Sequence, residues 1–202
     1  MSVYLVVILL LCCAVIALSV GAMLMAAKRR TSINVWAGVM LFGAGAWSLL
    51  MLLFMLQTES AMAALYAKAY YLTAIIMAFG LYKFSTHYPI SHKITDIERA
   101  ASWLLPAIAL AIVLMPHGVV VYAAVDHMMN TVKLDTIWYL FYTAIFAILI
   151  SVAFVRLVSS YRQVRRTHNK KFAHQVLMMT YTLGVVVIAG AYFDIFLPMI
   201  GN

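Results

Sequence analysis

Long runs of apolar residues alternate along this chain with short polar gaps. About 20 apolar residues in a helix are enough to cross the hydrocarbon core of a bilayer, which is about 30 Å thick. The runs cover residues 3–27, 35–56, 61–85, 101–115, 137–158 and 172–196, and residues 97–99 can extend the short fourth run. The pattern predicts an all-α membrane bundle of six transmembrane helices, in one sensor-type domain spanning residues 1–202.

The longest gap, residues 116–136, has a different pattern. A β-branched run around 119–121 is followed by a polar turn at 126–130 and a second short run at 131–134. Two such runs around a polar turn predict a short β-hairpin within residues 116–134, which would form a lid on the bundle. A plain surface loop is the alternative.

Composition and charge add an orientation. Hydrophobic residues make up 66% of the chain and charged residues 10%, against about 25% charged in soluble domains. All of the Lys and Arg residues except Lys68 and Lys133 lie in, or at the edges of, the gaps 28–34, 86–100 and 159–171. Basic loops stay on the cytoplasmic side, so we expect the N-terminus outside. Membrane lipids, rather than nucleic acid, are the expected partners of these loops.

Several segments together resemble a known family. They are the glycine- and tryptophan-rich stretch 36–47, Tyr88-Pro89, residues 174–177, the region of Gly184, and residues 194–201. These resemble the N-terminal seven-helix membrane region of bacterial histidine kinases, which also precedes cyclic-dinucleotide synthase domains. The resemblance covers nearly the whole chain, through the sixth helix.

The resemblance implies a signal-input module of a two-component system in the bacterial inner membrane. Six spans that begin outside also end outside, so a cytoplasmic output domain or partner would be reached through a seventh helix. The sequence contains no kinase domain, phosphoacceptor-histidine helix or nucleotide-binding domain, so we expect no enzyme activity from the chain itself.

Lys68 is the most unusual residue inside an apolar run. It lies about 10 Å from the outer end of the third run, at 1.5 Å per residue. Charged residues inside a membrane are candidates for function, although a lysine can also extend its ammonium to the interface. Asp194, near the outer end of the sixth run, is its expected partner, because each charge would offset the other's loss of solvent.

Tyrosines surround this position. Tyr71 lies on the Lys68 side of its helix, whereas Tyr66 and Tyr70 lie on the opposite side. Tyr139 and Tyr142 begin the fifth run, and Tyr192 lies in the sixth. The predicted ligand site, for a small polar or anionic molecule, is formed by Lys68, Asp194, Tyr71, Tyr139, Tyr142 and Tyr192. An aromatic belt at the membrane interface is the alternative.

We predict no cofactor or metal. A membrane haem needs facing histidines inside the bundle, and all six histidines lie near run ends or in the 116–136 gap. His117, Asp126 and His127 lack a metal-ligand spacing. Gly38, Gly43 and Gly45 form a small-residue surface that favours close helix packing, either within the chain or in a homodimer.

A membrane sensor is therefore the predicted function. An accessory or structural subunit of a membrane complex is the alternative. A small transporter is less favoured, because transporters usually carry polar residues at mid-membrane positions and these positions are mostly apolar here.

Overall fold

The computed structural model describes residues 3–28, 31–91, 93–125, 130–166 and 170–191. The described elements, in chain order, are α1 (Val3–Met25), α2 (Ser32–Leu56), α3 (Ser60–His87), α4 (Asp96–Leu114), β1 (Val120–Ala124), β2 (Thr131–Leu134), α5 (Thr136–Arg166) and α6 (Lys170–Ala191). Each predicted apolar run therefore forms a helix as far as it is described; residues 192–196 of the sixth run lie outside the described residues. The helical class is confirmed, and the hairpin forms within the predicted range.

Five of these helices are long and apolar enough to cross a membrane, namely Leu5–Met25 of α1 and the whole of α2, α3, α4 and α5. Their spans agree with the predicted runs, apart from two ends that continue into polar sequence. α4 begins at Asp96 because Thr95 caps it, with the Thr95 hydroxyl accepting a hydrogen bond from the Glu98 amide at 3.2 Å. α5 continues to Arg166, well beyond its apolar part.

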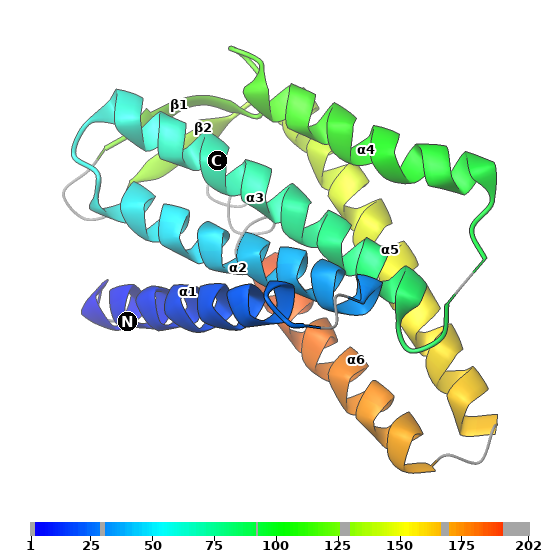
Figure 1. Cartoon of the computed structure of the whole chain (residues 1–202). Coiled ribbons are helices and arrows are strands. Elements are labelled where there is room, and N and C mark those ends of the chain that lie inside the picture. Colours follow the sequence, from blue (N-terminus) through cyan, green and yellow to red (C-terminus); the bar gives the residue numbers. More distant parts are fainter. Residues whose placement is uncertain (1–2, 29–30, 92, 126–129, 167–169, 192–202) are drawn as a thin grey trace.

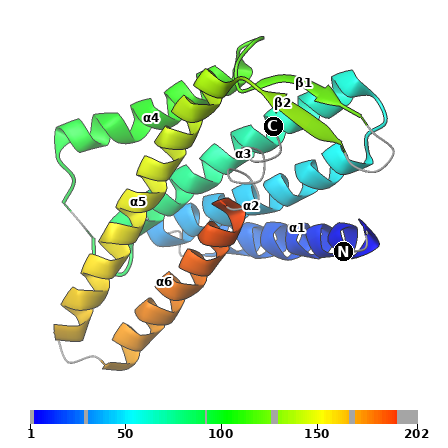
Figure 2. The same cartoon turned by 180° about the vertical axis from the view of Figure 1, so that it is seen from behind.

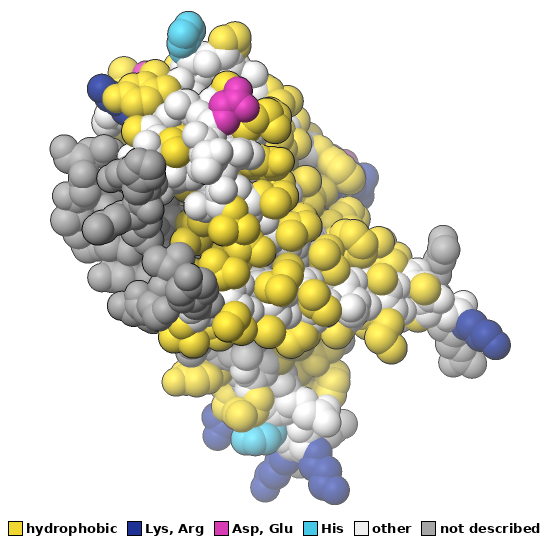
Figure 3. Space-filling view, turned by 90° about the vertical axis from the view of Figure 1, so that its left-hand side faces the viewer, with side chains coloured by type: hydrophobic (Ala, Val, Ile, Leu, Met, Phe, Trp, Pro, Cys, Tyr) yellow, Lys and Arg dark blue, Asp and Glu magenta, His cyan; other side chains and the backbone are white. Residues whose placement is uncertain are grey.

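The bundle has two chemically different ends. At the hairpin end lie the α2–α3 connection, the hairpin and the start of α5 (Figure 1). The basic end holds the α1–α2, α3–α4 and α5–α6 connections with their lysines and arginines. In the space-filling view, hydrophobic side chains cover the middle of the visible face and Lys and Arg lie at its margins (Figure 3). Such a surface suits a bilayer between two aqueous layers.

α3 is the central helix of the bundle. It lies between α2 on one side and α4 and α5 on the other, while α1 packs mainly on α2 and α6 mainly on α5 (Figures 1 and 2). Its buried positions extend from Ala63 to Thr86. A movement of α3 would therefore change its packing against α2, α4, α5 and the hairpin.

Glycines allow α2 and α3 to pack backbone against backbone. A Cβ atom added at Gly80 of α3 would lie 2.8 Å from the Met40 amide nitrogen of α2. One added at Gly43 of α2 would lie 2.9 Å from the Met77 amide nitrogen of α3. Both distances are too short for a real side chain. Gly38 and Gly45 face α1, where an added Cβ atom would first meet the side chains of Met25 and Leu18. The small-residue surface is thus used for packing within the chain.

The hairpin covers the end of α3. β1 and β2 pair antiparallel, with Tyr122 opposite Lys133, and Val120 and Ala123 are buried. The Asn130 side-chain amide donates hydrogen bonds to the carbonyl oxygens of Phe54 and Gln57 at 2.6 and 2.7 Å. These bonds satisfy carbonyls at the C-terminal end of α2 and connect the hairpin to it.

Candidate functional site: two polar clusters at opposite ends of α3

Lys68 joins α3 to the end of α4. Its ammonium donates hydrogen bonds to the carbonyl oxygens of Met115 and Pro116, at 3.2 and 3.5 Å. These groups follow the last turn of α4, where the helix dipole places partial negative charge. Lys68 is partly exposed. Its two hydrogen bonds connect α3 to α4 at the hairpin end. Asp194, its predicted partner, and Tyr192 lie outside the described residues.

Three of the predicted site tyrosines come together, and one of them, Tyr71, lies one helical turn from Lys68 on α3. The Tyr71 ring lies 6.3 Å from the Tyr139 ring and 5.4 Å from the Tyr142 ring, both edge to face. The Tyr142 hydroxyl donates a 2.9 Å hydrogen bond to the Tyr71 carbonyl oxygen. All three side chains are buried, so they lie inside the bundle rather than in a belt on its surface.

Tyr70 also belongs to this cluster. Its ring centroid lies 4.6 Å from that of Tyr71 and 5.9 Å from that of Phe54 in α2. The sequence predicts Tyr70 and Tyr71 on different sides of the helix. Both are buried, because α3 is surrounded by α2, α5 and the hairpin and has bundle-facing positions on both sides.

A polar depression adjoins the hairpin end. It has a volume of about 520 Å³. Its lining includes Gln57, Thr58 and Ser60 from the α2–α3 connection and Asn130 from the hairpin. This cavity could admit a small polar molecule.

The basic end holds a second cluster that sequence reasoning missed. Lys83 of α3 is only 6% exposed, and its ammonium donates a 2.8 Å hydrogen bond to the Ser102 hydroxyl of α4. Three aromatic rings surround the ammonium, and the distances to their centroids are 4.8 Å for Trp103, 5.4 Å for Phe79 and 5.8 Å for Tyr82. The faces of aromatic rings attract a cation, and the attraction is stronger when the cation is desolvated.

Arg156 of α5 completes this cluster. It is 9% exposed and forms an ion pair with Glu98 in the first turn of α4. Its guanidinium carbon lies 4.7 Å from the centroid of the Tyr82 ring. The Nη1 nitrogen is buried and has no hydrogen-bond partner among the described residues. Of the two buried cations, Arg156 is paired with a carboxylate, whereas Lys83 bonds to a neutral hydroxyl.

The sequence did contain a signal for Arg156. Buried residues of α5 include Ala153, Leu157, Ser160 and Val164, at helical spacings around Arg156. Arg156 thus belongs to the inward stripe of its helix. The sequence places Arg156 and Lys83 at the edges of basic loops, because other basic residues follow them along the chain.

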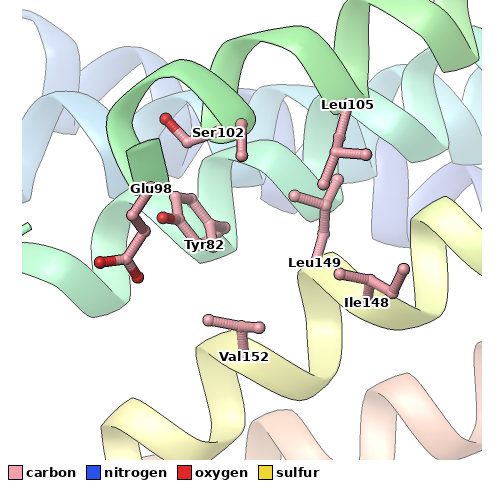
Figure 4. Close-up of a pocket in the computed structure, with 8 residues that line it drawn as sticks. Tyr82, Glu98, Ser102, Leu105, Ile148, Leu149 and Val152 are labelled. Atoms are coloured by element: carbon pink, nitrogen blue, oxygen red, sulfur yellow. The ribbon is translucent and has the colours of Figure 1, made fainter. Parts of the chain in front are cut away.

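A small groove lies next to this cluster, between α4 and α5. It has a volume of about 150 Å³. Its lining residues are Glu98, Ala101, Ser102 and Leu105 of α4, Ile148, Leu149 and Val152 of α5, and Tyr82 of α3. Leu105 and Leu149 point toward each other at one end, and Glu98 and Tyr82 lie at the other (Figure 4).

Long apolar helices with basic residues at one end define a multi-pass membrane protein. Residues 9–200 match the family described as the N-terminal 7TM region of histidine kinase. Because this match takes in nearly all of the chain, the chain belongs to that family, as the sequence resemblance predicted. It is accordingly a membrane sensor-type region. A search for similar curated proteins and for similar solved structures finds no match.

Proposed function

We propose that the chain is the signal-input module of a histidine-kinase-type signalling protein, and that α3 carries a change from the hairpin end to the basic end. One observation above all supports this. A lysine near each end of α3 bonds to α4, Lys68 to the carbonyls after its last turn and Lys83 to Ser102 near its first turn. A stimulus that alters one contact changes how α3 sits against α4, and so affects the other.

The proposed stimulus site is at the hairpin end, on Lys68, Tyr71, Tyr139 and Tyr142, with Asp194 and Tyr192 as further members. A small ligand with an anionic or strongly accepting group would compete with the Met115 and Pro116 carbonyls for the Lys68 ammonium. Such a ligand shifts the conformation of the module only if it binds the state without the Lys68–carbonyl hydrogen bonds better than the state that has them. A membrane cue that moves α4 would act on the same contact.

The proposed orientation places all six helices across the inner membrane, with the N-terminus and the hairpin end outside. The gathering of basic residues at the opposite end supports it. A signal received at the hairpin end would then travel toward the cytoplasm, where a kinase-type output acts.

Cysteine labelling tests this orientation. In a Cys12→Ala, Cys13→Ala background, a membrane-impermeant maleimide applied to intact cells should label Thr58→Cys and Lys133→Cys. Lys93→Cys and Arg165→Cys should react only after the cells are permeabilised. Labelling of the basic-end cysteines in intact cells would show that the basic end lies outside, which contradicts the proposed orientation and direction of signalling.

Removing the Lys68 hydrogen bonds tests whether α3 transmits a change from the hairpin end to the basic end. In lipid nanodiscs, Lys68→Met should raise amide hydrogen exchange about tenfold in residues 112–115 and His117, because hydrogen bonds to a charged donor are lost. If α3 transmits the change, exchange should also rise at the basic end, in residues 93–99 and 156–166.

Lys133→Met is the matched control, since Lys133 is an exposed lysine of the hairpin. It should leave exchange at the basic end unchanged. If Lys68→Met affects only the hairpin end, the chain behaves as a passive structural subunit, and the signal-input proposal fails.

A further inference from the structure

The groove between α4 and α5 has a gradient of polarity along its length. Leu105, Ile148 and Leu149 line its inner part, nearer the middle of the bundle. Ser102 and Tyr82 come next, and Glu98 lies at the basic end. A molecule that fits this gradient has a hydrocarbon chain and a polar head that stays at the basic end.

Glu98 is the one charged residue among the described residues that line the groove, and the cations lie directly behind the lining, with Lys83 bonded to Ser102 and Arg156 paired with Glu98. Lys83 and Arg156 are buried, and Arg99 lies close by on α4. Glu98 pairs with Arg156, and the exposed Asp96 pairs with Arg99 at 3.1 Å. No carboxylate among the described residues forms an ion pair with Lys83. The cluster therefore has one unmatched positive charge, and Arg156 Nη1 lacks an acceptor within the described part of the chain.

The groove can be entered from the side. α4 and α5 lie close together near the hairpin and diverge toward the basic end (Figures 1 and 2). Ile148 on the groove wall is exposed on the outer surface of the bundle, as is Leu104 of α4, next in sequence to the lining residue Leu105. In a bilayer these surfaces face lipid, so part of an acyl chain can reach the groove from the side.

The geometry points to a binding site for one anionic phospholipid at this groove. Its acyl chain lies along Leu105, Leu149 and Val152, and its phosphate lies at the basic end beside Lys83 and Arg156. A rotation of the Arg156 side chain brings Nη1 to a phosphate oxygen, which supplies the missing acceptor. Basic pockets between membrane helices bind anionic headgroups in this manner. The inference requires membrane insertion but not the proposed signalling role.

Lipid selection during native mass spectrometry tests the site. The chain is taken from nanodiscs that contain equal amounts of dioleoyl-phosphatidylglycerol and dioleoyl-phosphatidylcholine, and the lipid retained on the singly loaded protein is identified. Phosphatidylglycerol should exceed phosphatidylcholine about fivefold, the effect of one basic residue beside an anionic headgroup. Arg156→Gln should bring the ratio close to one.

A second variant fills the groove without altering any charge. Ala101→Leu places a larger side chain on the groove wall and should reduce retention of both lipids, whatever happens to the folding of Arg156→Gln. Ala107→Leu is its matched control, because Ala107 is an exposed alanine of α4 that does not line the groove. Arg165→Gln removes an exposed arginine of α5 and is the control for charge alone.

Three results would overturn the proposal. The first is equal retention of the two lipids by the unaltered chain. The second is a loss with Ala107→Leu or Arg165→Gln as large as that with the groove variants, which would indicate unspecific lipid contact. The third is a change in the monomer–dimer distribution of Ala101→Leu with lipid retention unaffected, which would make the groove a contact between two copies of this chain.

Discussion

Replacing Gly80 by alanine is expected to lower the free energy of unfolding by about 1–3 kcal/mol, the usual cost of inserting a group into a closely packed core. The added Cβ would lie 2.8 Å from the Met40 amide nitrogen and 2.9 Å from the Met40 Cα. Both are backbone atoms of α2, so no side-chain rotation can relieve the contact. α2 and α3 must move apart along their interface.

Gly184→Ala is the matched control for this substitution. Among the described residues, its Cβ would meet the Phe154 ring, at 3.6 Å, which is ordinary contact. Alanine also favours helix over glycine by about 1 kcal/mol, so this variant should be neutral or slightly more stable. Helix content followed by circular dichroism during denaturation measures both. Equal stability of the two variants would contradict the close α2–α3 packing.

Replacing Glu98 by glutamine is expected to destabilise the basic end by about 2 kcal/mol. The substitution leaves the buried Arg156 guanidinium without its carboxylate, and breaking a buried pair from one side typically costs about 3–5 kcal/mol. The Glu98 side chain is 36% exposed, so solvent screening reduces the loss. The same denaturation experiment measures it, and faster hydrogen exchange in residues 96–102 would locate it.

Asp96→Asn provides the comparison for Glu98. Asp96 is another first-turn acid of α4 that pairs with an arginine, but its side chain is 94% exposed and that of Arg99 is 64% exposed. An exposed ion pair contributes little to stability, so this variant should unfold almost like the unaltered chain. If both variants lose the same stability, the effect comes from the first turn of α4 and not from burial of Arg156.

The helices and the hairpin were predictable because their signals are local. An apolar run of span length, or two β-like runs around a polar turn, needs no knowledge of neighbouring segments. The α4 and α5 boundaries were less accurate. Asp96 and Glu98 are polar residues that complete a capped first turn, and polarity alone cannot separate such a turn from a loop.

The candidate sites depended more on tertiary contacts. Sequence selected Lys68, Tyr71, Tyr139 and Tyr142 by residue type and depth, and the three tyrosines do come together. The Met115 and Pro116 carbonyls were not foreseen as partners of Lys68, because backbone acceptors leave no mark in the sequence. Lys83 and Arg156 were grouped with the basic loops, since burial depends on which helices surround a residue.

The sequence by itself determined that the protein lies in a membrane, that it is helical, and that its basic residues gather at one end. These properties follow from the hydropathy and order of residues along the chain. Only the tertiary structure decided that Gly43 and Gly80 serve α2–α3 packing, that Lys68 and Lys83 bond α3 to α4 at both ends, and that the buried Arg156 pairs with Glu98. These contacts join residues far apart in the chain, and their formation depends on which helix faces meet.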